Sequence, residues 1–374
     1  MDRENIQKRI KRVRSRFLEN DLDAIVVLSD ANRRYLSGYT GEDGSYDETA
    51  GILVITENEL VLAADPRYDT QAANETDLYR VVCYKKPLEK ELTATLASLG
   101  AKKVGMETGR ITCQQYKKIE AEIACQKLDM ALHPADEILK TLRIRKDDNE
   151  ISAIRAALKI AETSFLEFRQ ALRRGMTEKE AAWLLEKTMR ANGADGLSFP
   201  VIAASGENSA LPHAIPGDRR FNAKEPLLFD FGARLHGYCS DTTRTLVMGE
   251  PDTTFKEAYD TVFTAQQMAV DQIKPGTAAK NIDRIAREHI DATRFKGRFE
   301  HSLGHGVGIA IHEAPRLSKL DDTVLEPGMV VTVEPGIYIP GWGGIRLENM
   351  VLVTPTGAEV LNTMGYEDFV ITCG

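Results

Sequence analysis

Two pairs of acidic residues interrupt apolar strands in the C-terminal half of the chain, and no other feature constrains the fold as strongly. Asp230 and Asp241 lie in LLFDFGARLHGYCSDTTRTLVMG, and Glu334 and Glu348 lie in VVTVEPGIYIPGWGGIRLENMVLVT. Both segments place apolar and β-branched runs around glycine-containing turns, a pattern typical of β-hairpins.

The spacing within each pair predicts that its two acids face each other. In an antiparallel ladder, the numbers of opposed residues have a constant sum, which places one turn between Leu235 and His236 and the other at Gly341. Opposed Cβ atoms are roughly 4.5–5.5 Å apart. Two carboxylates at that distance repel, and one would normally stay protonated. Two such pairs on apolar strands therefore predict a site for two metal ions.

Three of the seven histidines fall in one segment, HSLGHGVGIAIHE, as His301, His305 and His312. Its glycines let the backbone approach another group closely. The segment lacks the Gly-Lys-Ser/Thr ending of a phosphate loop, and no second histidine follows His312 at the spacing of a zinc HExxH motif. Three histidines so close together, in a chain with four convergent carboxylates, are therefore candidates for the same site.

Length and composition exclude several classes of protein. A chain of 374 residues suggests two domains, and the net charge of −8 argues against nucleic acid or an anionic membrane as a partner. The polar, basic N-terminus predicts a surface helix instead of a signal peptide, and no apolar run approaches the roughly 20 residues of a membrane span. Five cysteines without a CxxC pair indicate reduced thiols and a cytoplasmic location.

The chain divides at LRIRKDDNE, between residues 142 and 143. Residues 1–142 predict a small α/β domain: a helix over 3–20, a strand over 24–28, a hairpin turning at Glu57–Asn58, then mixed helices and strands. We find no catalytic constellation there, and we expect ANRRYLSGYTG to form a polar loop.

Residues 143–374 predict the order helix, helix, hairpin twice. Asp147 or Asp148 caps the first helix, and Thr177 with Glu180 forms a capping box for the second. A second helix pair spans 255–273 and 277–295 and precedes the histidine-rich segment. Each copy delivers two acids, which suggests an internal pseudo-repeat.

Taken together, these residues resemble the pita-bread metallopeptidase family of Xaa-Pro aminopeptidases, prolidases and methionine aminopeptidases. The resemblance covers essentially the whole chain and implies an α/β (α+β) fold. A creatinase-like N-terminal domain would occupy 1–142, and a pita-bread catalytic domain with a pseudo-two-fold repeat would occupy 143–374. It implies five metal ligands in order, with Asp241 and Glu348 bridging two ions: Asp230, Asp241, His305, Glu334 and Glu348.

Four carboxylates and one imidazole form a hard, oxygen-rich set of ligands. This set favours Mn²⁺, with Co²⁺, Fe²⁺ or Zn²⁺ as alternatives. Two such ions about 3.5–4 Å apart would lower the pKa of a bound water and polarise a scissile carbonyl.

The resemblance also implies roles for residues around the ligands. Glu334 would carry a proton towards the leaving nitrogen, and His213 and His312 would stabilise the tetrahedral intermediate. His301 would line the pocket for proline. Arg346 would orient a ligand carboxylate.

Tyr338 is either a further hydrogen-bonding residue of the site or an ordinary strand tyrosine. We count it with His301 and Arg346 as a substrate-binding residue.

The function predicted first is Xaa-Pro aminopeptidase activity on small peptides with proline in second position. Prolidase activity limited to Xaa-Pro dipeptides is the alternative, because the same site serves both. Methionine aminopeptidases usually lack so large an N-terminal domain, and creatinases and non-catalytic binding scaffolds on this fold lack ligands that are present here. A homodimer is the expectation from the family.

Overall fold

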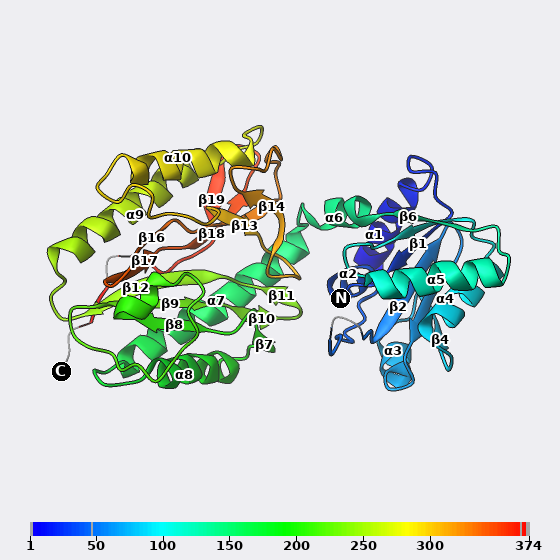
Figure 1. The fold of residues 1–374 in the computed structure, drawn as a ribbon, viewed down its shortest axis with the longest axis horizontal. Helices are drawn as coiled ribbons and strands as arrows, with labels where there is room; N and C mark the ends of the chain where they lie inside the picture. The colour runs from blue at the N-terminus through cyan, green and yellow to red at the C-terminus, as the bar shows by residue number, and fades with distance from the viewer. Residues whose placement is uncertain (1–2, 46–47, 367–368, 372–374) are drawn as a thin grey trace. The chain divides into compact units, whose positions relative to one another are not determined.

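The computed structural model describes residues 3–45, 48–366 and 369–371. It divides into two compact units, Met1–Arg143 and Ile144–Gly374, which we describe separately (Figure 1). Among the helices of the described residues, none is both long and apolar enough to cross a membrane.

The first unit is a six-stranded sheet with helices on its faces, in the strand order β4-β3-β2-β1-β5-β6. Helices α4 and α5 cover one face, where Leu92, Leu96 and Ile119 pack against apolar strand residues. The predicted turn at Glu57–Asn58 is confirmed by the β2–β3 register. The elements are α1 (Arg3–Ser15), β1 (Ala24–Val27), α2 (Asp30–Ser37), β2 (Gly51–Thr56), β3 (Leu60–Ala64), α3 (Asp69–Glu75), β4 (Arg80–Cys83), α4 (Leu88–Ser98), β5 (Lys103–Met106), α5 (Cys113–Cys125), β6 (Ala131–Pro134) and α6 (Asp136–Arg143).

The expected polar loop at ANRRYLSGYTG is wrong, because most of it is helix α2. Ser29 caps this helix, and Gly38 ends it in the left-handed conformation. The guanidinium of Arg33 is fully buried and ion-paired with Asp43, so its charge is satisfied inside the unit.

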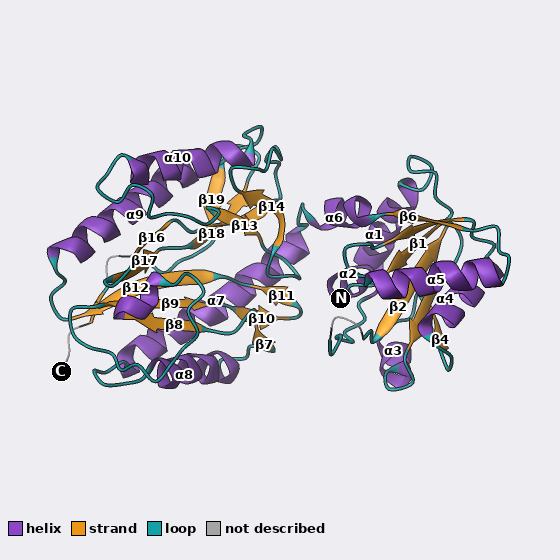
Figure 2. Cartoon of the chain, in the orientation of Figure 1, coloured by secondary structure: helices purple, strands orange, loops and turns teal. Residues whose placement is uncertain are grey.

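The second unit repeats one arrangement, a helix pair beside a sheet (Figure 2). Helices α7 and α8 share an apolar core with β8, β9 and β12, while α9 and α10 share one with β15 to β18. Its first half contains α7 (Asp148–Ala171), α8 (Glu178–Ala191), β7 (Gly196–Leu197), β8 (Ile202–Ser205), the 3₁₀ helix η1 (Gly206–Ala210), β9 (Pro226–Phe231), β10 (Ala233–Leu235), β11 (Tyr238–Cys239) and β12 (Thr242–Met248). The second half contains α9 (Thr253–Asp271), α10 (Ala279–Asp291), β13 (Gly304–Gly306), β14 (Glu313–Leu317), β15 (Val330–Val333), β16 (Gly336–Ile339), β17 (Gly343–Arg346), β18 (Asn349–Val353), β19 (Ala358–Val360) and β20 (Val370–Ile371).

Capping residues start the first two helices of this unit as the sequence predicts. The side chain of Asp147 accepts a hydrogen bond from the backbone N–H of Glu150, and the side chain of Glu150 accepts one from the backbone N–H of Asp147. Thr177 and Glu180 form the same reciprocal box at α8. These boxes satisfy amides that would otherwise be orphaned at each helix start.

The predicted register of the first acidic hairpin is wrong by two residues. Asp230 lies opposite Thr243, not Asp241, and the turn consists of His236 and Gly237. Both turn residues have positive φ, 51° and 85°, which is the conformation of a tight two-residue hairpin turn. A shift of two keeps every side chain on its face, so the two acids remain on the same side but as diagonal neighbours.

The predicted register of the second acidic hairpin is confirmed. Val333 pairs with Asn349, and Gly336 pairs with Arg346. The residue numbers of both pairs have the same sum as Glu334 and Glu348, so these two acids lie in the predicted register. The two glutamates lie where the ladder passes from β15–β18 to β16–β17. Gly341 lies in the turn, with a φ of 78°.

Candidate metal centre

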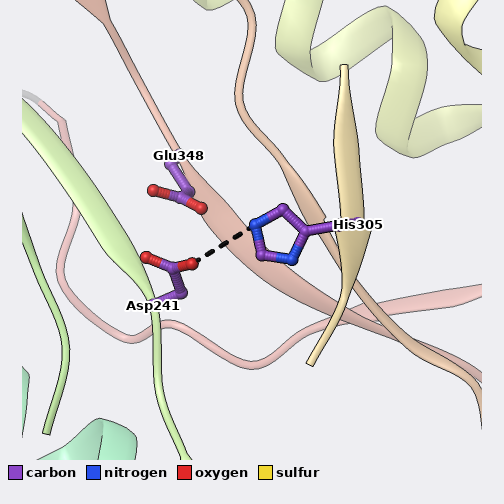
Figure 3. A group of neighbouring side chains, drawn as sticks. All are labelled: Asp241, His305 and Glu348. Carbon is purple, nitrogen blue, oxygen red and sulfur yellow. Dashed lines mark ion pairs between the residues drawn. The ribbon is translucent and has the colours of Figure 1, made fainter. Parts of the chain in front are cut away.

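Three of the five predicted metal ligands converge on one point in the second unit. Asp241 lies just before β12, His305 on β13 and Glu348 just before β18, and their side chains point towards one another (Figure 3). One potential ligand atom from each lies within 4.8 Å of the other two. Three segments that are well separated in sequence therefore supply a single cluster of metal-binding groups.

Glu334 joins this cluster through His305. The Nε2 atom of His305 lies 3.4 Å from a carboxylate oxygen of Glu334 and 3.5 Å from one of Asp241. The other ring nitrogen, Nδ1, lies 3.0 Å from the carbonyl oxygen of Gly306 and therefore carries the proton. The lone pair of Nε2 is thus directed at the carboxylates, as a metal ligand requires.

The fifth predicted ligand, Asp230, is held by Arg346. The buried guanidinium donates to one Asp230 oxygen at 2.6 Å and to the hydroxyl oxygen of Thr243 at 3.1 Å. Thr243 in turn donates to Glu348 at 2.6 Å. One arginine therefore orients a carboxylate of each acidic pair, directly for Asp230 and through Thr243 for Glu348.

Tyr338 and His301 extend the same network. The Tyr338 hydroxyl accepts a hydrogen bond from Arg346 at 2.9 Å and donates to Nε2 of His301 at 2.9 Å. The Nδ1–H of His301 is bonded to the carbonyl oxygen of Ser302. Burial, and then the charge of Arg346, lowers the pKa of His301 to about 3, so this imidazole is neutral near pH 7.

A cavity of about 520 Å³ opens over these side chains. His213, on the segment between η1 and β9, and His312, just before β14, both line it and are solvent-exposed. The ring of His312 contacts that of His305 edge-on, with centroids 4.4 Å apart. Apolar residues form another part of the wall, namely Phe199, Pro200, Val201, Ile202, Ile215 and Ile311.

The structure adds residues that the sequence patterns did not indicate. Thr243 and Thr332 donate to Glu348 and Glu334, and a correct hairpin register would have indicated Thr243 because it lies opposite Asp230. Arg316 on β14 lines the cavity with an exposed guanidinium. Only its position, four residues after His312, could have indicated it.

The carboxylates of the cluster resist ionisation together. Burial, and then the charge of Glu348, raises the pKa of Asp241 well above its usual value. Burial, and then the charge of Glu334, likewise raises the pKa of Glu348 well above its usual value. Burial raises the pKa of Glu334 to about 8 although Arg346 opposes the shift, and burial lowers the pKa of His305 to about 4.

The described residues fit divalent cations on two counts. The Oδ1 atom of Asp230 and the Oε1 atom of Glu348 are buried and make no hydrogen bond to any residue that the structure describes. Buried polar atoms of this kind normally have a partner. The donor set is carboxylate and imidazole without thiolate, which suits hard and intermediate divalent ions.

Comparison with protein families divides the chain as the fold does. Residues 9–145 match the creatinase/prolidase N-terminal domain, and residues 152–355 match metallopeptidase family M24.

Relatives and solved structures align over nearly the whole chain. An Xaa-Pro dipeptidase of Pyrococcus furiosus is 37% identical over 350 residues, covering 92% of this chain and 94% of its own. The structure of an Xaa-Pro dipeptidase from Bacillus anthracis superposes with a TM-score of 0.90 at 37% identity, covering 98% of this chain and 100% of that one. The structure of an X-Pro aminopeptidase from Thermotoga maritima superposes with a TM-score of 0.85 at 37% identity, covering 97% of this chain and 100% of that one.

The pKa shifts predict how stability of the metal-free protein depends on pH. A carboxyl whose pKa is raised on folding contributes stability at low pH that is lost as the pH rises through its folded pKa, about 8 for Glu334. Buried histidines have the opposite sign, but above about pH 6.5 they are neutral in both states. We therefore expect the melting temperature of chelator-treated protein to fall by about 5 °C or more between pH 6.5 and 9, since one pKa unit is ~1.4 kcal/mol.

Two controls accompany that melting experiment. Mn²⁺-loaded protein should show a smaller fall, because bound cations favour the ionised carboxylates. Glu334→Gln should flatten the metal-free profile. A metal-free melting temperature that stays constant or rises across this range would contradict the assigned electrostatics.

Proposed function

This chain belongs to metallopeptidase family M24, and from that premise we propose that it hydrolyses the bond between an N-terminal residue and a following proline. The observation that carries the proposal is the convergence of the carboxylate–imidazole cluster and two exposed histidines on one cavity. The Xaa-Pro names of the relatives point to the same substrate class.

We propose that Asp230, Asp241, His305, Glu334 and Glu348 hold two divalent ions, with Mn²⁺ the first candidate. Such ions would acidify a bound water and polarise the scissile carbonyl. The residues of the chain prepare the site for them: Arg346 and Thr243 hold carboxylates in place, and the proton on Nδ1 of His305 leaves Nε2 available.

Three side chains are assigned to the reaction itself. Glu334, whose pKa lies near neutrality in the metal-free site, can accept and return a proton close to the cluster. His213 and His312 reach the cavity from opposite halves of the repeat, where they can hydrogen-bond the oxygen that gains charge in the transition state. His301 is already bonded through both nitrogens, so we assign it to the cavity wall.

Proline selectivity follows from the chemistry of its peptide bond and from the walls of the cavity. An Xaa-Pro amide has no N–H, so a site that required that donor would reject it. Apolar side chains line this cavity beside the metal cluster, including Val201, Ile202 and Ile311. A pyrrolidine ring can bind such a surface by shape.

One observation favours a second candidate function, prolidase activity restricted to Xaa-Pro dipeptides. The exposed guanidinium of Arg316 lies on the cavity wall, where its charge lowers the pKa of His312 after the effect of burial. In an Xaa-Pro dipeptide, the proline itself carries the terminal carboxylate. A guanidinium within the cavity can bind that carboxylate, whereas a longer peptide has a neutral amide there.

The proline preference is testable with matched dipeptides. We expect Mn²⁺-loaded protein to cleave Ala-Pro at least tenfold better in kcat/KM than Ala-Ala, because the apolar wall favours the ring by about 1.4 kcal/mol. Product release measured by chromatography gives both rates. Equal rates on the two peptides would move the assignment to a general aminopeptidase.

The role of Arg316 is testable with substrates that differ only at the carboxyl end. We expect Arg316→Met to raise KM for Ala-Pro about tenfold or more and to change KM for Ala-Pro-amide less than threefold, since a charge-assisted bond contributes about 1.5–3 kcal/mol. Arg284→Met, on the exposed surface of α10, serves as the control. An equal change for both substrates would exclude carboxylate recognition by Arg316.

A further inference from the structure

Glu178, the first residue of helix α8, is a fully buried carboxylate outside the metal cluster. It does not line the cavity, and its neighbours Thr177 and Glu180 already satisfy the helix cap. A buried carboxylate is unfavourable unless hydrogen bonds or charges compensate it. The hydrogen bonds that compensate the Glu178 carboxylate therefore indicate its role.

Four donors from a single segment surround the Glu178 carboxylate. Oε1 accepts from the backbone N–H of Ser205 at 2.8 Å and from its hydroxyl at 2.9 Å. Oε2 accepts from the side-chain amide of Asn208 at 2.8 Å and from the backbone N–H of Gly217 at 2.9 Å. Ser205 ends strand β8, so one carboxylate binds both ends of the 205–217 loop.

The 205–217 loop carries the cavity wall that contains His213. Its residues 212–216 all line the cavity. The imidazole of His213 makes no hydrogen bond to the residues that the structure describes, so the backbone of the loop determines where it lies. Arg346 provides a further attachment by donating to the carbonyl oxygen of Pro212 at 3.1 Å.

We propose that Glu178 is a positioning residue that holds the 205–217 loop and thereby places His213 over the metal cluster. The inference rests on the proposed function, because it assumes that His213 acts on the reacting peptide. It adds a residue outside the cavity whose effect on turnover passes through the position of His213.

The substitution Glu178→Gln tests whether the carboxylate holds both ends of the 205–217 loop. Each carboxylate oxygen of Glu178 accepts one backbone N–H, from Ser205 or from Gly217. An amide has only one acceptor oxygen, so glutamine must leave one end of the loop facing a donor. Glu207→Gln, an exposed glutamate in the same loop, is the matched control.

We expect Glu178→Gln to lower kcat on Ala-Pro at least tenfold, with the metal content per chain unchanged and the control within twofold of wild type. In a His213→Ala background, the same change should lower kcat by no more than a further twofold, because two residues that act through one group are not additive. Amide hydrogen exchange of the 205–217 peptides should also be faster in Glu178→Gln than in the control.

The outcomes separate this inference from the proposed function. Wild-type turnover in His213→Ala would reject the role given to His213, and the inference with it. Impaired turnover in His213→Ala but not in Glu178→Gln would reject the inference alone, as would an undiminished tenfold effect of Glu178→Gln in the His213→Ala background.

If Glu178→Gln does not fold, Asn208→Ala removes one of the four hydrogen bonds and decides the same question. We expect it to lower kcat about threefold in the wild-type background and to have no effect on top of His213→Ala. Unchanged kcat in the wild-type background, or the same fall in both backgrounds, would overturn the inference.

Discussion

Repulsion between buried carboxylates is the constraint on which the catalytic unit depends. Asp241 and Glu348 are almost completely buried; besides burial, the charge of Glu348 raises the pKa of Asp241, and the charge of Glu334 raises the pKa of Glu348. A fold that brings such groups together must supply rigid strands, and it must supply positive charge. The strands come from two hairpins of the repeat, and Arg346 supplies one fixed positive charge. Bound cations are the remaining source, which is why the cluster is better explained by metal binding than by stability of the fold.

The surrounding residues form two supports for this cluster. A continuous set of hydrogen bonds from Arg346, Thr243 and Tyr338 reaches two of the acids, Asp230 and Glu348, and His301. The 205–217 loop carries His213 to the cavity and is bonded near both ends to Glu178. Arg346 also bonds to Pro212 and so connects the two supports. The groups that hold the site are thus buried and hydrogen-bonded, which suits the precise positioning that the proposed reaction requires.

The sequence predicted much of this because the informative signals are local. The helix cap at Asp147 or Asp148, the capping box at Thr177 and the pairing of Glu334 with Glu348 each depend on a few residues. The structure confirms all three, with Asp147 as the cap. The first hairpin failed because a single turn residue decides a register: His236 adopts a positive φ that its residue type does not require. Helix α2 was missed because its polar arginine is buried against Asp43, a partner ten residues away. The roles proposed for Arg316 and Glu178 rest on neighbours that only the folded chain brings together.

We propose that the five predicted side chains bind two cations together. Anomalous diffraction from crystals of the protein grown with Mn²⁺ tests it most directly, because it locates each ion independently of activity. We expect two anomalous peaks about 3.5–4 Å apart, both in contact with Asp241 and Glu348, one with Asp230, and the other with His305 and Glu334. No peak at the cluster, or peaks whose ligands lie elsewhere, would contradict it.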